Sequence, residues 1–160
     1  MTEWHDFFVA EVGSSAALVG LLFVAVSLNS AKILAFKALP DRALIDFFLL
    51  MGILIYSSLA LVPEQPFWLL GIEIVAVSLL IWANVTRLDV RVHREIQPEY
   101  RVSLWIYTFL IQGGTLPAIV GGVLLILGIG GGIYLLVPAL IFSFVRALTD
   151  AWVLLVEINR

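Results

Sequence analysis

Five runs of mainly apolar residues, each about as long as a bilayer is thick, constrain this chain more than any other feature. A helix needs about 20 apolar residues to cross the roughly 30 Å of hydrocarbon, because each residue adds about 1.5 Å. The runs show no two-residue alternation, and backbone groups in lipid must bond within their own segment. The sequence therefore predicts an all-α, polytopic transmembrane helical bundle with one domain over residues 1–160. The five predicted spans are 7–29, 43–62, 67–86, 103–127 and 132–156.

The composition supports this class. Hydrophobic residues make up 62% of the chain and charged residues 13%, and the mean hydropathy is +1.08. A soluble domain has roughly 45–50% apolar and about 25% charged residues. A water-soluble globule is therefore excluded, and the lipid bilayer is the expected surrounding. The chain has no cysteine, which excludes disulfides and thiolate metal sites.

Basic residues are concentrated in two of the four predicted connections. By the positive-inside rule these connections are cytoplasmic, which predicts an outside N-terminus and a cytoplasmic C-terminus. An alternative has four spans, with the glycine-rich fourth segment re-entrant. Acidic residues dilute the basic third connection, so no nucleic-acid partner is expected. The basic residues are Lys32, Lys37 and Arg42 in the first connection and Arg87, Arg91, Arg94 and Arg101 in the third.

The first connection alternates lysines with apolar residues. This pattern predicts a helical extension or a short helix at the membrane surface. Pro40 is expected to interrupt it, and Asp41 is expected to cap the second span.

A stripe of small residues follows one face of the first span. Small residues let helices approach closely in lipid. The stripe has two interpretations: packing within the chain, or packing against a copy in a neighbouring subunit. Gly113, Gly121 and Gly128 predict similar close contacts in the fourth span. The stripe consists of Gly13, Ala16, Ala17, Gly20 and Ser27.

Four of the ionisable residues inside the predicted spans are candidates for a functional role. Arg146 and Asp150 are one helical turn apart, so we expect them to form an ion pair. The pair either neutralises itself and anchors its helix, or belongs to an ion or proton pathway. Glu11 and Glu73 are expected at similar depth on the outer side. They are either two carboxylates near the interface or part of a cation-attracting vestibule.

The stretch QGGTLP, from Gln112 to Pro117, is the least helix-like part of the fourth span. Pro117 cannot donate a backbone hydrogen bond and clashes with the carbonyl of Gly113, which predicts a kink. The kink serves packing alone, or it forms a hinge or a break that coordinates a solute. The candidate polar pathway therefore comprises Glu11, Glu73, Gln112, Arg146 and Asp150.

Motifs of soluble enzymes are missing. The sequence has no phosphate-binding lysine loop and no His-Glu-x-x-His pattern, and GIGGG at residues 128–132 does not fit a dinucleotide-binding fingerprint. His5 and His93 fall on opposite sides of the predicted membrane. We therefore expect no enzymatic activity, no cofactor and no metal site.

Two stretches resemble a known family. The opening WHDFFVAEVGSSAALVGLLFVAVSLN and the closing AWVLLVEINR are similar to those of small bacterial multi-span membrane proteins, some of which carry the label "modulator of FtsH protease". The resemblance covers about a quarter of the chain. It implies a location in the bacterial inner membrane and, through the label, a partner in membrane proteolysis.

Two functional hypotheses follow. The first is a small homo-oligomeric channel for ions or protons, which the charged residues inside the spans suggest. The second is a regulatory or assembly subunit of a larger membrane complex, without transport activity. The absence of any soluble domain and the family resemblance suggest the second.

Overall fold

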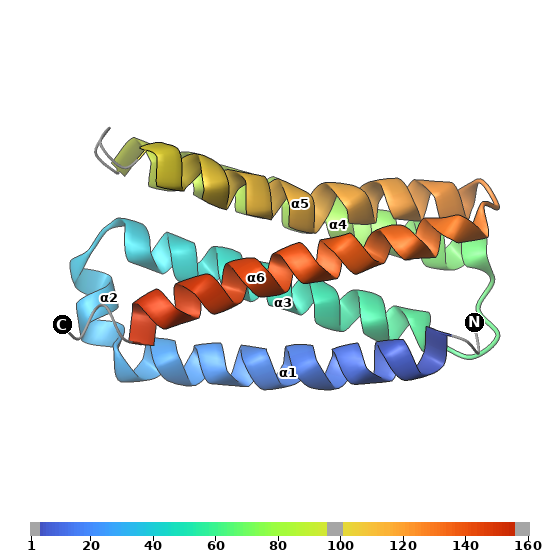
Figure 1. Cartoon of the computed structure of the whole chain (residues 1–160), viewed down its shortest axis with the longest axis horizontal. Coiled ribbons are helices and arrows are strands. Elements are labelled where there is room, and N and C mark those ends of the chain that lie inside the picture. The colour runs from blue at the N-terminus through green and yellow to red at the C-terminus, as the bar shows by residue number, and fades with distance from the viewer. Residues whose placement is uncertain (1–3, 96–100, 156–160) are drawn as a thin grey trace.

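The computed structural model describes residues 4–95 and 101–155, and these residues form helices and short connections without strands (Figure 1). Five segments are long and apolar enough to cross a membrane, as the sequence predicts. The fifth of these combines a short 3₁₀ helix with the helix that follows it. The elements are α1 (His5–Leu28), α2 (Ser30–Ala35), α3 (Ala38–Ala60), α4 (Phe67–Glu95), α5 (Arg101–Ile126), η3 (Gly130–Leu135) and α6 (Leu136–Leu155).

Helices α3, α4, α5 and α6 form an antiparallel ring, in which each packs against the next and α6 closes against α3. Helix α1 lies outside this ring, mainly against α3 and with a smaller contact to α6 (Figure 1). The end of the bundle that carries α2 is called the α2 end here. The α3–α4 loop and the turn before η3 lie at the opposite end, beside the start of α1 (Figure 1).

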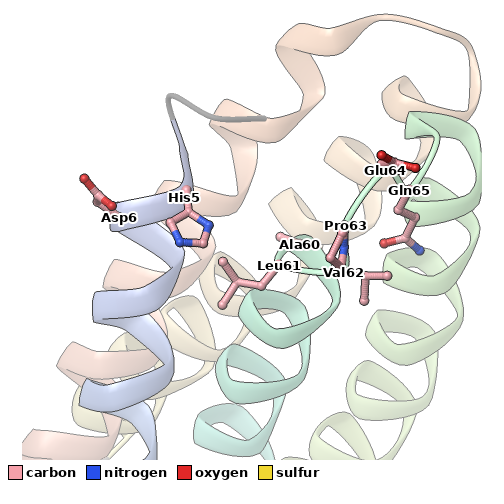
Figure 2. Close-up of a pocket in the computed structure, with 8 residues that line it drawn as sticks. All are labelled: His5, Asp6, Ala60, Leu61, Val62, Pro63, Glu64 and Gln65. Atoms are coloured by element: carbon pink, nitrogen blue, oxygen red, sulfur yellow. The ribbon is translucent and has the colours of Figure 1, made fainter.

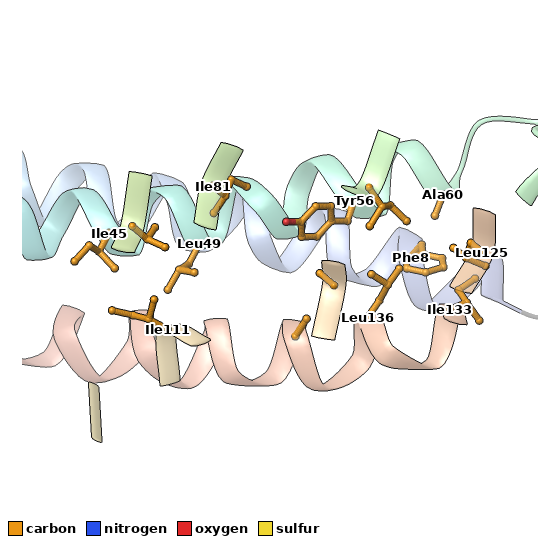
Figure 3. Packing of buried hydrophobic residues seen from close by; sticks show 14 of the residues in the cluster. Phe8, Ile45, Leu49, Tyr56, Ala60, Ile81, Ile111, Leu125, Ile133 and Leu136 are labelled. Atoms are coloured by element: carbon orange, nitrogen blue, oxygen red, sulfur yellow. The ribbon is translucent and has the colours of Figure 1, made fainter. Parts of the chain in front are cut away.

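The inside of the ring is filled by apolar side chains from all of its helices, as Figure 3 shows. Such close packing, rather than transfer out of water, is what holds helices together in an apolar solvent. A second apolar cluster lies where α1, α2, α3 and α6 meet. Core residues labelled in Figure 3 include Phe8, Ile45, Leu49, Tyr56, Ile81, Ile111, Leu125 and Leu136.

Glycines bring α4 and α5 into backbone contact. A methyl group added at Gly71 would lie 2.6 Å from the carbonyl oxygen of Gly122 and 2.8 Å from the backbone nitrogen of Ile126. Because both neighbours are backbone atoms, neither can move aside like a side chain. Only glycine fits this helix crossing.

The close contacts predicted for two glycines of the fourth span are present. A methyl group at Gly113 would lie 2.8 Å from the ring of Phe142, and one at Gly121 would lie 2.6 Å from the carbonyl oxygen of Gly132. For Gly128 the prediction is wrong. It follows the end of α5 with φ of 78°, and a methyl group added there would have no atom within 4 Å.

The second span begins earlier than predicted. Helix α3 starts at Ala38, so Pro40 lies in its first turn and does not interrupt a helix. Proline suits a first turn because its missing N–H needs no partner there. Asp41 is therefore inside the helix, and Lys37 occupies the N-cap position without a side-chain cap bond. The short helix predicted in the first connection is α2.

The other boundaries also differ from the predictions. Helix α4 continues nine residues beyond residue 86, to Glu95. Helix α5 runs unbroken through Pro117, so neither a break at QGGTLP nor a re-entrant fourth segment is present, and the kink stays a prediction. The fifth segment begins with the 3₁₀ turns of η3. Residue 156 and the end of the AWVLLVEINR stretch lie outside the described residues.

Candidate functional site

The most unusual feature of the bundle is a buried group of charged side chains in its α2-end half, called the charged cluster here. Arg42 and Asp46 come from α3, Tyr107 from α5, and Arg146 and Asp150 from α6. Arg146 and Asp150 are each 1% exposed and Asp46 is fully buried. Of the four charged members only Arg42 reaches the surface, with 17% of its side chain exposed. Charged side chains of α3 and α6 thus meet at this point, and an aromatic ring from α5 lies against them.

The ion pairs of the cluster join α3 to α6. Arg42 donates to both carboxylate oxygens of Asp150, from Nη2 at 2.5 Å and from Nε at 3.2 Å. Arg146 Nη1 lies 3.1 Å from Oδ1 of Asp46 and also contacts the carboxylate of Asp150. The ion pair expected between Arg146 and Asp150 is therefore present, but each arginine also reaches an aspartate of the other helix. Two cations and two anions balance within the cluster.

Tyr107 lies against both arginines. The guanidinium carbon of Arg42 is 4.9 Å from the centre of its ring, and that of Arg146 is 4.6 Å away. An aromatic face attracts a cation at such distances. Tyr107 thus connects α5 to the ion pairs between α3 and α6.

One sequence pattern, Arg-Ala-Leu-x-Asp, supplies both halves of the cluster. It occurs at residues 42–46 in α3 and again at residues 146–150 in α6. Because the two helices are antiparallel, the arginine of each copy comes beside the aspartate of the other. The environments match as well: Ala43 and Ala147 are buried in the same apolar cluster, while Leu44 and Leu148 are exposed.

The cluster is a charge-balanced set of ion pairs that holds α3 and α6 together. Burying one unpaired charge in an apolar region is unfavourable, so each member depends on its partners. The oxygens of Asp46 have no well-aligned hydrogen bond, so its attraction to Arg146 is mainly a charge–charge interaction. The cluster contains no nucleophile beside a general base. Among the described residues no group of three or more histidines and acids is placed to hold a metal ion.

The other predicted polar residues have separate partners. Gln112 accepts a hydrogen bond of 2.9 Å from the indole N–H of Trp82, which joins α5 to α4. Glu73 accepts a hydrogen bond from the side-chain amide of Gln65 at the opposite end of the bundle. One carboxylate oxygen of Glu11 is covered and has no hydrogen bond. Of the five candidate pathway residues, Arg146 and Asp150 contact each other, while Gln112 and Glu73 contact residues outside the set.

The small stripe of α1 faces away from the bundle. All five of its residues are exposed, and a methyl group added at Gly13 or Gly20 would have no atom within 4 Å. The stripe is therefore not used for packing within the described chain. At about 3.6 residues per turn, Glu11 lies roughly 160° around the helix from Gly13. It shares the packed side of α1 with the buried Phe8, Ser15 and Leu22.

A hollow of about 480 Å³ lies at the opposite end, between the start of α1 and the α3–α4 loop. It is lined by His5, Asp6 and residues 60–65, and Figure 2 shows the ring of His5 turned toward Leu61 while Asp6 points away. Glu64, in the loop between Pro63 and Pro66, has a φ of 57°. The polar groups that line the hollow do not converge on one point.

Sequence reasoning missed three members of the charged cluster. The positive-inside rule treats Arg42 as a loop charge that sets orientation, and it says nothing of Asp46 or Tyr107. The repeated Arg-Ala-Leu-x-Asp pattern is the signal that identifies Arg42 and Asp46. No local pattern identifies Tyr107, because its role depends on how α5 packs against the other two helices.

Comparisons of the chain with protein-family models, with curated proteins and with solved structures find no match.

Proposed function

We propose that this chain is a multi-pass protein of a bacterial inner membrane that acts as a subunit, by packing side by side with copies of itself. Its five long apolar helices support the membrane location. The basic residues gathered at the α2 end support a cytoplasmic position for that end and an outside N-terminus. The proposal includes no cofactor and no catalytic step.

The observation that carries the proposal is the unused face of α1. In the most apolar 18-residue stretch of each helix, only 17% of α1 is buried inside the chain, against 56% of α3. The exposed side carries Gly13, Ala16, Ala17 and Gly20, whose backbones another helix can approach closely. Close approach favours association in lipid because dispersion and weak backbone contacts replace the missing hydrophobic force.

This face also determines the kind of contact. Glu11 lies on the other side of α1, so an interface on the stripe does not bring the Glu11 carboxylates of neighbouring copies together. The same face fits a helix of a larger membrane complex, which is the regulatory or assembly hypothesis. A second copy is the simpler occupant, because it needs no other gene product.

Conduction of ions or protons is a second candidate, and the charged cluster favours it. An isolated charge in the middle of a spanning helix costs about 2.5–3.5 kcal/mol on insertion scales, and such residues often line ion or proton pathways. Arg42 gives the cluster an exposed edge. Since side chains fill the inside of the ring, a pathway would have to run between subunits or require the ring to open.

The association is tested by counting subunits in lipid vesicles through single-molecule photobleaching. Gly20→Ile and Ala17→Ile add bulk to the stripe and should convert oligomers into monomers. Ala76→Ile is the matched control, because Ala76 is also small and exposed but lies on α4. It should leave the subunit count unchanged. A wild-type chain that stays monomeric at every protein-to-lipid ratio contradicts self-association.

Two further measurements separate the alternatives. A different chain that co-purifies from native membranes in fixed ratio, and that is lost in Ala17→Ile, would favour the assembly hypothesis over self-association. Flux of protons or alkali cations into vesicles, abolished by Asp46→Asn in a chain that still folds, would favour conduction. No flux across a range of pH and voltage would count against it.

A further inference from the structure

Three arginines project from one face of α4 at the α2 end. Arg87, Arg91 and Arg94 follow one another at steps of four and three residues, which places them on one side of the helix. All three are exposed, and they line a hollow of about 470 Å³ together with Trp82, Ala83, Thr86 and Val90. The hollow is thus basic at its far end and mainly apolar toward the middle of α4.

The depth of these arginines matches a lipid headgroup layer. Arg87 comes 20 residues after Phe67, so at about 1.5 Å per residue it lies about 30 Å from the start of α4, which is the thickness of the hydrocarbon. Arg91 and Arg94 lie about 6 and 10 Å further along. The part of α4 that extends beyond the predicted span is therefore the part that carries the charges.

Along the exposed face of α4, apolar residues come first and basic residues follow, as the acyl chain and the charged headgroup do in a phospholipid. Ile72, Leu79 and Leu80 are 46%, 46% and 67% exposed and lie on the same side of the helix as Arg87. An acyl chain can lie along these residues while the headgroup reaches the arginines. The indole of Trp82 is held at the border between the two parts by its hydrogen bond to Gln112.

Nearby acids do not neutralise the three arginines in the described part of the chain. Asp89 is 7% exposed and points to α5, where it accepts a hydrogen bond of 2.8 Å from Thr108 and lies 3.6 Å from a ring nitrogen of His93. Glu95 is exposed at the end of the helix. No ion pair of Arg87, Arg91 or Arg94 is formed among residues 4–95 and 101–155.

We propose that Arg87, Arg91 and Arg94 form a binding site for the phosphate of an anionic phospholipid in the leaflet at the α2 end. The guanidinium groups bind the headgroup by charge-assisted hydrogen bonds, and the apolar face of α4 holds an acyl chain. The site is independent of the α1 face and does not require the chain to oligomerise.

Native mass spectrometry of the full chain released from nanodiscs tests this proposal. The nanodiscs contain equal amounts of phosphatidylglycerol and phosphatidylcholine, and the measured quantity is the ratio of the two lipids that stay bound. The wild-type chain should retain phosphatidylglycerol preferentially. Arg87→Gln with Arg91→Gln should lower the ratio at least about fivefold, because the variant loses two guanidinium groups that hydrogen-bond the headgroup directly.

The matched control is Lys32→Gln with Lys37→Gln, which removes two positive charges from the same end of the bundle. It should change the ratio less than about twofold, because neither lysine lines the hollow that retains the lipid. An equal loss in both double variants would show diffuse attraction to the surface and overturn the site. Equal retention of the two lipids by the wild-type chain would also overturn it and would leave the arginines to another acidic partner. Displacement of the lipid by millimolar inorganic phosphate would show that a free anion is sufficient, and would likewise contradict the proposal.

A second measurement does not depend on the arginine variants. Because the chain has no cysteine, Val90→Cys offers a single position for a fluorophore within the hollow, and Leu148→Cys offers one on the exposed side of α6. Phosphatidylglycerol that carries a quencher on its acyl chain should quench the Val90 label more strongly than phosphatidylcholine with the same quencher. The two lipids should quench the Leu148 label equally. The same lipid preference at both positions would overturn the proposal.

Discussion

Arg146 is the first residue at which the fold can be tested. Its guanidinium is buried between Asp46 and Asp150, and it is the largest fully buried side chain of the described residues. Arg146→Leu removes the cation that faces Asp46 and leaves a fully buried carboxylate unpaired. We expect the free energy of unfolding to fall by about 3–5 kcal/mol, measured by denaturant titration in detergent micelles.

Two controls distinguish the lost charge balance from a general effect of substitution. Adding Asp46→Leu to Arg146→Leu removes the unpaired carboxylate, so most of the lost stability should return while Arg42 still pairs with Asp150. Lys37→Leu at an exposed position should stay within about 0.5 kcal/mol of the wild type. If the double variant is no more stable than Arg146→Leu, the ion pair is not the reason for the loss.

Tyr107 offers a second residue-scale prediction, because its ring lies against two guanidinium groups. Tyr107→Phe keeps the aromatic face and should leave thermal stability nearly unchanged. Tyr107→Leu keeps apolar bulk but loses the face, and should lower the free energy of unfolding by about 1–2 kcal/mol. The same loss of stability in both variants would show that the hydroxyl, and not the ring face, is what matters.

At the scale of elements, the contact between α4 and α5 depends on glycine. Gly71→Ala places a methyl group against backbone atoms of α5, so the helices must move apart. We expect a loss of about 1–3 kcal/mol in the free energy of unfolding, measured by the same titration. Gly20→Ala is the matched control on α1, where no neighbouring atom is met. A Gly71→Ala variant as stable as the control would show that the two helices are not in backbone contact.

The elements also show how far the sequence predicts this fold. Length and apolar content identify the five long helices, because these are properties of each segment alone. The predicted start of α3 is wrong because Pro40 is a breaker in mid-helix but suits a first turn. The small residues of α1 indicate close packing, yet only the arrangement of α3 and α6 shows that they face outward.

The candidate site is less predictable for a similar reason. The spacing of Arg146 and Asp150 indicates their contact within one helix. The contacts of Arg42 with Asp150 and of Arg146 with Asp46 join helices about 100 residues apart in the chain. They follow only when α3 and α6 are known to be antiparallel neighbours at this depth. The repeated Arg-Ala-Leu-x-Asp pattern supports such pairing but does not determine it.

For the whole molecule, the proposed orientation gives a direct prediction. Single cysteines at Glu64 and Lys37 lie in connections at opposite ends of the bundle, and the chain has no other cysteine. In cells whose outer membrane has been made permeable and whose inner membrane is intact, a membrane-impermeant maleimide should label Glu64→Cys. Lys37→Cys should be labelled only after the inner membrane is opened. The reverse pattern would show that the basic connections lie outside.

In the proposed assembly, copies of this chain meet through the exposed face of α1. Disulfide cross-linking between single cysteines along α1, carried out in native membranes, tests it most directly. Our proposal predicts cross-linked dimers with cysteine at residues 13, 16, 17 and 20, and none at the packed positions 15 and 22. Cross-links that are absent at the stripe, or that occur on both sides of α1 without helical periodicity, would contradict it.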